Sequence, residues 1–366
     1  ASLADNIGVG DAIVYDSNDD GTINGSDSIV FISARASSTE YTVQDEDGTT
    51  PSNLVTAEDD WSIYRAYTSL ANAEAGTINT AISGLDISFD SWTGGRDLVA
   101  NNEQWNIACY GDDVDTVAVS VNNWTTGEDY YLKIFTPYKS TEVGVSQRHS
   151  GVWDDGKFNM IEKIDLVDAG TYVRIDGLQI HITANNDDWH HAVLINNTVK
   201  DGVVKISNNI IQGSLTNTSG ENWGIFFRAG SVLEDSFVYN NIIYGWGDGG
   251  NNRNTGVYTT TSVKLFNNTI YDCDIALTSN ANTESLIYNN ILYSSSISDF
   301  YNVSAGAVIR NNILSDNSLS APHNIPDVKI DFIDPYNKNF HLHPTDTTAI
   351  NAGTTTVFST IPELAY

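Results

Sequence analysis

An Asn-Asn pair in an aliphatic frame recurs five times in this chain, and this repeat constrains the fold more than any other feature. Successive copies are 32, 27, 22 and 22 residues apart, because the second Asn of each pair is Asn209, Asn241, Asn268, Asn290 and Asn312. Repeats at such spacings are typical of solenoid proteins. A constant phrase with a varying period indicates that the loops between copies vary while the repeated unit does not.

Apolar residues occupy fixed positions around each pair. The residue two before the pair is aliphatic (Ile206, Val238, Leu265, Ile287, Ile309), and the residue two after it is Ile or Leu. We expect these positions to stack as a core. Asn tolerates the left-handed backbone conformation and suits a bend between two short strands, where its amide can bond to the Asn of the next copy. An earlier, degenerate copy is Ile175 to Leu178.

Length and charge limit the classes of function. A solenoid can bury 366 residues around one continuous core. The 47 acidic and 17 basic residues give a formal charge of -30, which repels phosphate backbones and anionic lipid. No apolar run has the length of a membrane span. We therefore predict no nucleic-acid partner and no membrane insertion, and metal cations are better partners.

The termini and cysteines bear on where the protein resides. Cys109 and Cys273 are far apart in sequence, which predicts buried thiols rather than a disulfide scaffold or a metal cluster. The chain begins with Ala-Ser-Leu instead of Met and is poor in Lys and rich in Asn, Thr, Ser and Gly. These features favour a secreted, extracellular or cell-surface protein, although a terminus trimmed for expression would look the same.

Residues 1–57 are predicted to form a small β unit with strands at 12–15, 28–32 and 40–44. The loop at 16–27 has oxygen donors at the spacing of a calcium loop, with Gly21 at the sharp turn. It resembles the calcium loop of dockerin modules and of related EF-hand-like bacterial repeats. The resemblance implies structural calcium held by Asp16, Asn18, Asp20, the Thr22 carbonyl and Asp27.

This resemblance covers twelve residues and is incomplete. Dockerins carry two such loops with helices, whereas this copy is single and is followed by a β-type segment. We therefore carry over ion binding and not the recognition of cohesin. A metal-free hairpin rich in Asp, Asn and Gly is the alternative.

Residues 58–104 are predicted to contain a capping helix and a linker. Apolar residues recur at three- and four-residue steps from Trp61 to Ala75, and Gly76 is a suitable stop. An amphipathic helix just ahead of a solenoid is expected to cover apolar side chains of the first repeat. A helix that binds a partner is the alternative.

Residues 105–366 are predicted to form a parallel β-helix with closing turns at its C-terminal end. Each period holds a second strand, such as Ala192 to Asn196, and no helix. The chain resembles the right-handed parallel β-helix superfamily, the pectate-lyase-like group that includes polysaccharide lyases, polygalacturonases, phage tailspikes and adhesins. The Asn-Asn-Ile copies carry the resemblance together with the closing stretches at 331–335, 339–342 and 349–353. It implies an all-β solenoid.

Candidate catalytic residues fall into two groups, and neither is assigned a catalytic role. Lys205 shares an outward column with Lys264, as a lyase base would require, but a solvated strand face explains it equally. Asp187, Asp188 and His190 flank Trp189 in a loop that could hold a sugar ring. The Gly-His-Gly and Arg-Ile-Lys elements of polygalacturonases are absent. Hydrogen-bonded Asp residues beside a packed Trp are the alternative.

Two aromatic series could form exposed ladders along the coil. Such ladders stack against sugars, another subunit or a covering loop, or only against each other. Their members are Tyr239, Phe266 and Tyr288, and Tyr244, Tyr271 and Tyr293.

The sequence as a whole favours an extracellular structural or adhesive β-helix protein that is stabilised by calcium. Self-association into fibres or surface arrays and contacts with a cell surface or a polysaccharide are the expected partnerships, because strand edges at the ends of a coil can pair with another copy. The alternative is a polysaccharide-active enzyme, a lyase or glycoside hydrolase, or a carbohydrate-binding protein that uses the outer face of the coil.

Overall fold

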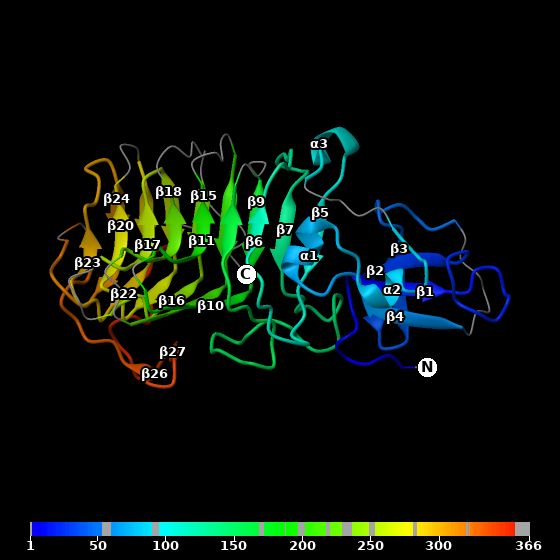
Figure 1. Cartoon of the computed structure of the whole chain (residues 1–366). Coiled ribbons are helices and arrows are strands. Elements are labelled where there is room, and N and C mark those ends of the chain that lie inside the picture. The colour runs from blue at the N-terminus through cyan, green and yellow to red at the C-terminus, as the bar shows by residue number, and fades with distance from the viewer. Residues whose placement is uncertain are drawn as a thin grey trace.

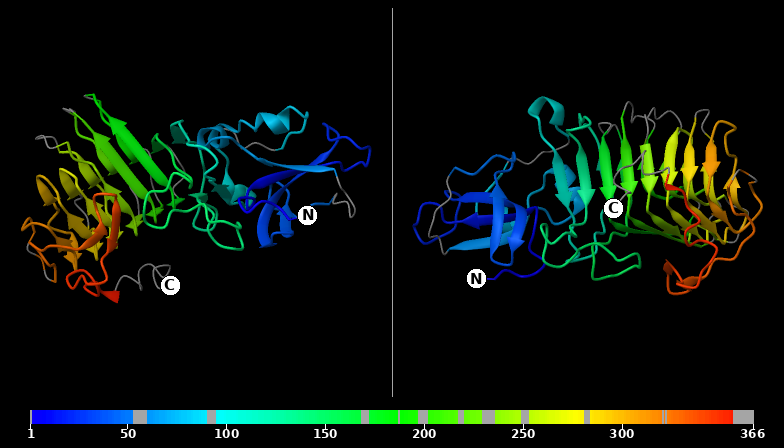
Figure 2. Two further views of the ribbon diagram at one scale, coloured as in Figure 1. Left: turned by 90° about the horizontal axis from the view of Figure 1, so that it is seen from below. Right: turned by 180° about the vertical axis from the view of Figure 1, so that it is seen from behind.

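The protein is mostly β, with long parallel sheets and, within the described residues, three short helices (Figure 1). The computed structural model describes residues 2–52, 60–89, 95–167, 172–186, 188–196, 202–216, 220–228, 236–248, 253–280, 284–319, 321 and 323–355. The N-terminal unit lies at one end of the stacked strands, and the last hairpin lies alongside them (Figures 1 and 2).

Three parallel sheets make up the stack, and from β9 to β25 consecutive strands join them in turn. We call each such set of strands a rung. The β5–β24 sheet contains β5 (Trp105–Ala108), β7 (Leu132–Phe135), β9 (Val173–Asp176), β12 (Val204–Ser207), β15 (Ser236–Tyr239), β18 (Val263–Phe266), β21 (Leu286–Tyr288) and β24 (Val308–Arg310).

The other two parallel sheets complete each rung. The β10–β25 sheet contains β10 (Gln179–Ala184), β13 (Ile210–Leu215), β16 (Ile242–Tyr244), β19 (Thr269–Tyr271), β22 (Ile291–Tyr293) and β25 (Ile313–Leu314). The β6–β23 sheet contains β6 (Val119–Val121), β8 (Ile164–Leu166), β11 (His191–Ile195), β14 (Trp223–Phe227), β17 (Thr255–Thr259), β20 (Ile275–Ser279) and β23 (Ser298–Tyr301). The arrangement is consistent with a β-helix-like solenoid.

The two Asn residues of each pair have different roles at the bend between strands. The first Asn adopts a left-handed backbone, with φ between 56° and 60° in all five copies. The second Asn is buried, and its Oδ1 accepts hydrogen bonds from the preceding rung. The predicted bend and ladder are both confirmed.

A continuous amide ladder links the second Asn residues. Each Nδ2 donates to the Oδ1 of the next rung at 2.9 to 3.2 Å, and the ladder ends on Asn324. Each Nδ2 also donates to a carbonyl of the preceding rung, such as Val238 O from Asn268 at 2.9 Å. The aliphatic columns on either side are buried in one core, as predicted, and each such side chain contributes about 1.5–3 kcal/mol by leaving water.

The N-terminal unit is an antiparallel sheet with strand order β3-β2-β1-β4. Its strands are β1 (Asp11–Tyr15), β2 (Ser28–Ser37), β3 (Glu40–Gln44) and β4 (Trp61–Arg65). The first three confirm the prediction. The helix expected from residue 61 is wrong in its first half, because 61–65 pairs with β1 and extends the sheet beyond residue 57. Apolar residues at 61, 63, 64, 66 and 67 fit a strand as well as a helix.

The described residues contain three helices, all short: α1 (Leu70–Ala75), α2 (Thr80–Ser83) and α3 (Leu98–Asn101). Ser69 caps α1 by accepting a hydrogen bond from the Asn72 N–H, and Gly76 ends it with φ 64°. Leu70 and Leu98 belong to the core of the stack. Since β6 is the outermost strand of its sheet and contacts α1, this helix covers the N-terminal end of the stack.

The C-terminal end of the stack is also covered. Leu319 and Ala321 pack against the core, and the Ile325 carbonyl accepts a hydrogen bond from the Leu314 N–H at 3.0 Å. The hairpin of β26 (Phe332–Asp334) and β27 (Asn339–Leu342) lies against the β10–β25 sheet (Figure 2). Other segments of the chain therefore cover the core of the stack at both of its ends.

The hairpin changes the expectation for one aromatic series. Tyr271 and Tyr293 stack at 6.0 Å, but Phe332 and Phe340 pack edge-on or tilted against them and bury Tyr244. The exposed ladder predicted here is therefore covered by a hairpin, one of the alternatives considered. In the other series Tyr239 and Phe266 are also buried, so their predicted exposure is wrong.

Candidate functional site

The loop that leads into β11 holds an exposed aromatic side chain, Trp189, between the candidate polar residues Asp188 and His190. Trp189 is 66% exposed. Asn186 connects its neighbours by accepting from Nε2 of His190 at 2.7 Å and donating to Asp188 at 3.1 Å. Burial lowers the pKa of His190, although Asp188 opposes the shift, so its imidazole is neutral at pH 7. Asp187 lies outside the described residues.

Further aromatic rings continue from Trp189 across the outer side of the β6–β23 sheet. Trp189 meets Trp223 edge-on at 5.6 Å, Trp223 stacks on Phe226 at 4.3 Å, and Phe226 contacts Tyr258 at 5.3 Å. Phe226 and Tyr258 are paired in register on neighbouring strands. We call these four residues the aromatic strip. Spacing in the sequence did not reveal it, because its members come from one loop and from two strands of the β6–β23 sheet, which does not carry the Asn-Asn phrase.

A file of basic side chains runs along the outer side of the β5–β24 sheet. Lys133, Arg174 and Lys205 are direct neighbours in register on successive strands, and Lys264 follows after Phe237. The predicted shared column of Lys205 and Lys264 is confirmed. Their amines lie 5.7 and 5.0 Å from the Phe237 ring centroid. The repeat does not indicate Lys133 as a member of this file, because its strand precedes the regular Asn-Asn phrase.

The two groups of candidate catalytic residues lie apart in the part of the chain that the structure describes. Lys205 lies on the β5–β24 sheet, whereas Asp188 and His190 precede β11 of the β6–β23 sheet. His191, next to them, pairs instead with Asp165 at 2.5 Å, and Lys163 contacts the other oxygen of that carboxylate at 2.9 Å. Among the described candidates, Lys205 therefore does not form one catalytic group with Asp188 and His190.

The loop at 16–27 closes on its own backbone. Asp16 accepts hydrogen bonds from the N–H groups of Asn18, Asp20 and Gly21, and Asp27 accepts from those of Ser17 and Asn24. Burial opposes ionisation of Asp16, but these backbone bonds outweigh it and lower its pKa. The oxygen donors suit calcium, yet in the part of the chain that the structure describes no three His, Cys, Asp or Glu side chains converge as a metal site.

The two cysteines, and two histidines near the C-terminal hairpin, make local contacts. Cys109 and Cys273 are free and buried, as predicted, and burial raises the pKa of both thiols. His341 bonds to Asn339 and His343 to Thr345, each at 2.7 Å, so each imidazole has its own neighbour. None of the described helices is long and apolar enough to cross a membrane.

No protein-family model matches the chain, and comparisons with curated proteins and with solved structures found no match.

Proposed function

We propose that this chain is an extracellular right-handed parallel β-helix that acts as an adhesive protein and binds polysaccharide without turning it over. The observation that carries the proposal is the aromatic strip, which exposes Trp189 beside the hydrogen-bonding side chains of Asn186, Asp188 and His190. Aromatic faces next to fixed polar groups suit the apolar faces and hydroxyls of sugar rings. The dispersion of the candidate catalytic residues favours binding over catalysis.

We expect Trp189→Ala to weaken polysaccharide binding about 5- to 30-fold, since losing one aromatic platform costs about 1–2 kcal/mol. Affinity electrophoresis against a panel of neutral and acidic polymers measures the effect. Trp61→Ala is the matched control, because Trp61 is 41% exposed on β4 in the N-terminal unit. Equal retention of both variants and the unaltered protein on every polymer would contradict the proposed surface.

A polysaccharide lyase is the second candidate function, and the basic file favours it. Four cations on one face of a chain with a formal charge of -30 provide a local site for an acidic polymer. The same polymers are incubated with the protein while the absorbance of unsaturated products is followed. Turnover that Lys205→Ala abolishes would replace adhesion with catalysis as the function.

Calcium remains part of the proposed function as a stabilising ion of the N-terminal unit. Calcium is expected to raise the melting temperature of the protein relative to chelator, and Asp16→Ala with Asp20→Ala to remove that response. Asp47→Ala is the control, since Asp47 accepts from Thr49 in a similar turn outside the loop. Identical melting of the unaltered protein with calcium and with chelator would remove the ion from the proposal.

Self-association also remains a proposal, and the covered ends restrict its form. Bare strand edges at the two ends of a coil would favour end-to-end fibres. Here α1 covers one end and the segment around Leu319 covers the other. Assembly is thus proposed through the sides of the stack, and light scattering at high protein concentration tests it.

A further inference from the structure

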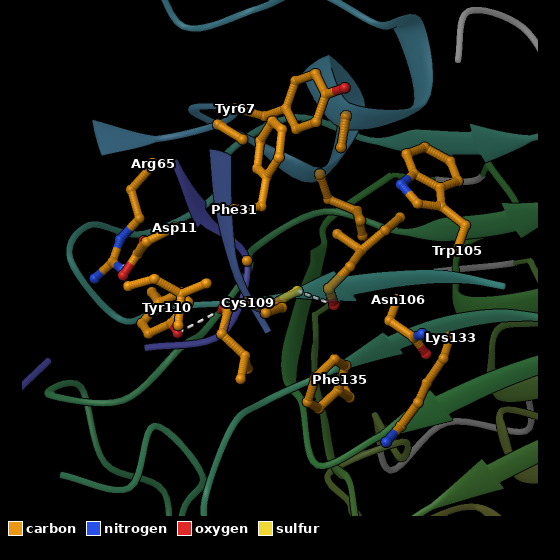
Figure 3. Close-up of a pocket in the computed structure, with 18 of the residues that line it drawn as sticks. Asp11, Phe31, Arg65, Tyr67, Trp105, Asn106, Cys109, Tyr110, Lys133 and Phe135 are labelled. Carbon is orange, nitrogen blue, oxygen red and sulfur yellow. Dashed lines mark hydrogen bonds and ion pairs between the residues drawn. The ribbon is translucent and has the colours of Figure 1, made fainter. Parts of the chain in front are cut away.

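A cavity of about 690 Å³ lies where the N-terminal unit meets the first strands of the stack (Figure 3). Two separate cores border it. The core of the N-terminal unit includes Ala12, Val14 and Ile82, and the core of the stack begins with residues such as Leu70 and Leu98. The space between them has the size of a small-molecule site.

Polar contacts connect the N-terminal unit to the stack beside the cavity. Arg65 of β4 binds Asp11 and, at 2.7 Å, Asp112, and its guanidinium lies 3.5 Å from the Tyr110 ring centroid. Tyr110 in turn donates to the Val9 carbonyl at 2.7 Å. These contacts fix the width of the cavity at one wall, where Figure 3 shows Asp11, Arg65 and Tyr110 together.

The apolar walls come from aromatic side chains of both units. Phe31 and Tyr67 pack edge-on against Phe89 at 5.0 and 5.7 Å on the N-terminal side. On the other side Trp105 stacks on Trp124 at 4.4 Å. Trp105 pairs in register with the buried Leu132, yet it is only partly buried, because β5 is the last strand of its sheet. The cavity therefore lies where a further rung would otherwise cover the Trp105 ring.

The charge of the residues that line the cavity determines which sign of charge a ligand can carry. Seven carboxylates and two cations line the cavity. One cation, Arg65, is already bound by Asp11 and Asp112, and the other, Lys133, lies across the cavity over the Phe135 ring at 4.1 Å (Figure 3). Asp45, Glu46 and Asp113 add further negative charge. Such a field repels anions and attracts cations, and aromatic faces add to the attraction.

We propose that this cavity binds a small organic cation. Its ammonium or guanidinium group faces the carboxylates, and its apolar body lies against Phe31, Tyr67 and Trp105. The shared chemistry allows two sources, a free amine or the side chain of a basic peptide. The site is separate from the aromatic strip and does not depend on the proposed adhesive function.

Calorimetric titration with phenethylamine, phenylethanol and phenylpropionate tests the proposal, because the three probes share a ring and differ in charge. Phenethylamine is expected to bind at least about tenfold more tightly than phenylpropionate, and added salt to weaken its binding. A short Lys-containing peptide, titrated in parallel, distinguishes the two sources. No heat from either cation at low millimolar concentration, or equal binding of the three probes, would overturn the proposal.

Two double variants with the same change in net charge locate the site. Glu46→Gln with Asp113→Asn alters exposed carboxylates of the lining and is expected to weaken phenethylamine binding about fivefold or more. Glu40→Gln with Glu128→Gln alters exposed carboxylates outside it and is expected to leave binding unchanged. Equal effects of both pairs would mean that the overall charge attracts the amine, which contradicts a site. Trp189→Ala should leave this binding intact, so failure here and failure of the adhesive function remain distinguishable.

Discussion

Asn268→Gly is expected to destabilise the protein by about 3–5 kcal/mol, because it removes four hydrogen bonds from a buried ladder. The Asn268 Oδ1 accepts from the N–H and the Nδ2 of Asn241, and its Nδ2 donates to Val238 O and to Asn290 Oδ1. Glycine leaves these partners buried and unpaired. Urea denaturation followed by circular dichroism measures the loss.

The neighbouring Asn provides a matched control for the same substitution. Asn267 adopts φ 56°, a conformation that glycine reaches without steric cost. Asn267→Gly should therefore change stability by about 1 kcal/mol or less. If both variants lost the same stability, the ladder would not be the source of the effect, and backbone entropy would explain it.

The second large effect is a dependence of stability on pH through Glu74 of α1. Its carboxylate accepts hydrogen bonds from the Asn122 N–H at 3.0 Å and from Nε1 of Trp124 at 3.1 Å. Burial nevertheless raises the pKa of Glu74 from 4.5 to about 7, against the pull of these two donors. The folded protein therefore keeps a proton on Glu74 over a pH range in which the unfolded chain has lost it.

The sign of the effect follows from proton linkage. Between pH 4.5 and about 7 the folded state binds the extra proton, so stability falls as pH rises through this window. The fall amounts to about 2–3 kcal/mol for this single group. Burial raises the pKa of Asp299 to about 6, which adds a fall in the same direction.

Glu74→Gln separates this group from the rest of the protein. The amide oxygen can still accept both hydrogen bonds, so the variant should be more stable than the unaltered protein at pH 8 and should lose less stability between pH 5 and 8. Glu128→Gln, at an exposed position, is the control for the change in net charge. Parallel stability curves for Glu74→Gln and the unaltered protein across this range would refute the assignment.

The Asn-Asn phrase could be interpreted from the sequence because its physics is local. A left-handed bend depends on one residue, and a stack of identical side chains depends only on repetition. The first Asn and the second Asn do meet these two requirements, and the flanking aliphatic columns form the core. The helix predicted from residue 61 is wrong over β4, because its residues fit both a helical and a strand pattern and only pairing with β1 decides between the two.

The positions of the candidate site residues depend far more on the tertiary fold than the Asn-Asn repeat does. Asp188 and His190 are close in sequence, and local hydrogen bonds keep them together, whereas their separation from Lys205 follows from the sheets that hold them. The aromatic strip joins Trp189 to Tyr258 across two strands. No spacing rule predicts such a strip, because the loops that set the register between these strands differ in length.

By itself the sequence determined the repeat, the bend and the core columns, since each of these needs only one residue type at one position of every copy. The tertiary structure alone decided that a hairpin buries Tyr244 and that a cavity separates the N-terminal unit from the stack. Both features arise from contacts between distant segments, such as Arg65 with Asp112 and Tyr271 with Phe332. Those contacts depend on the paths of loops of unequal length, and no local sequence pattern specifies these paths.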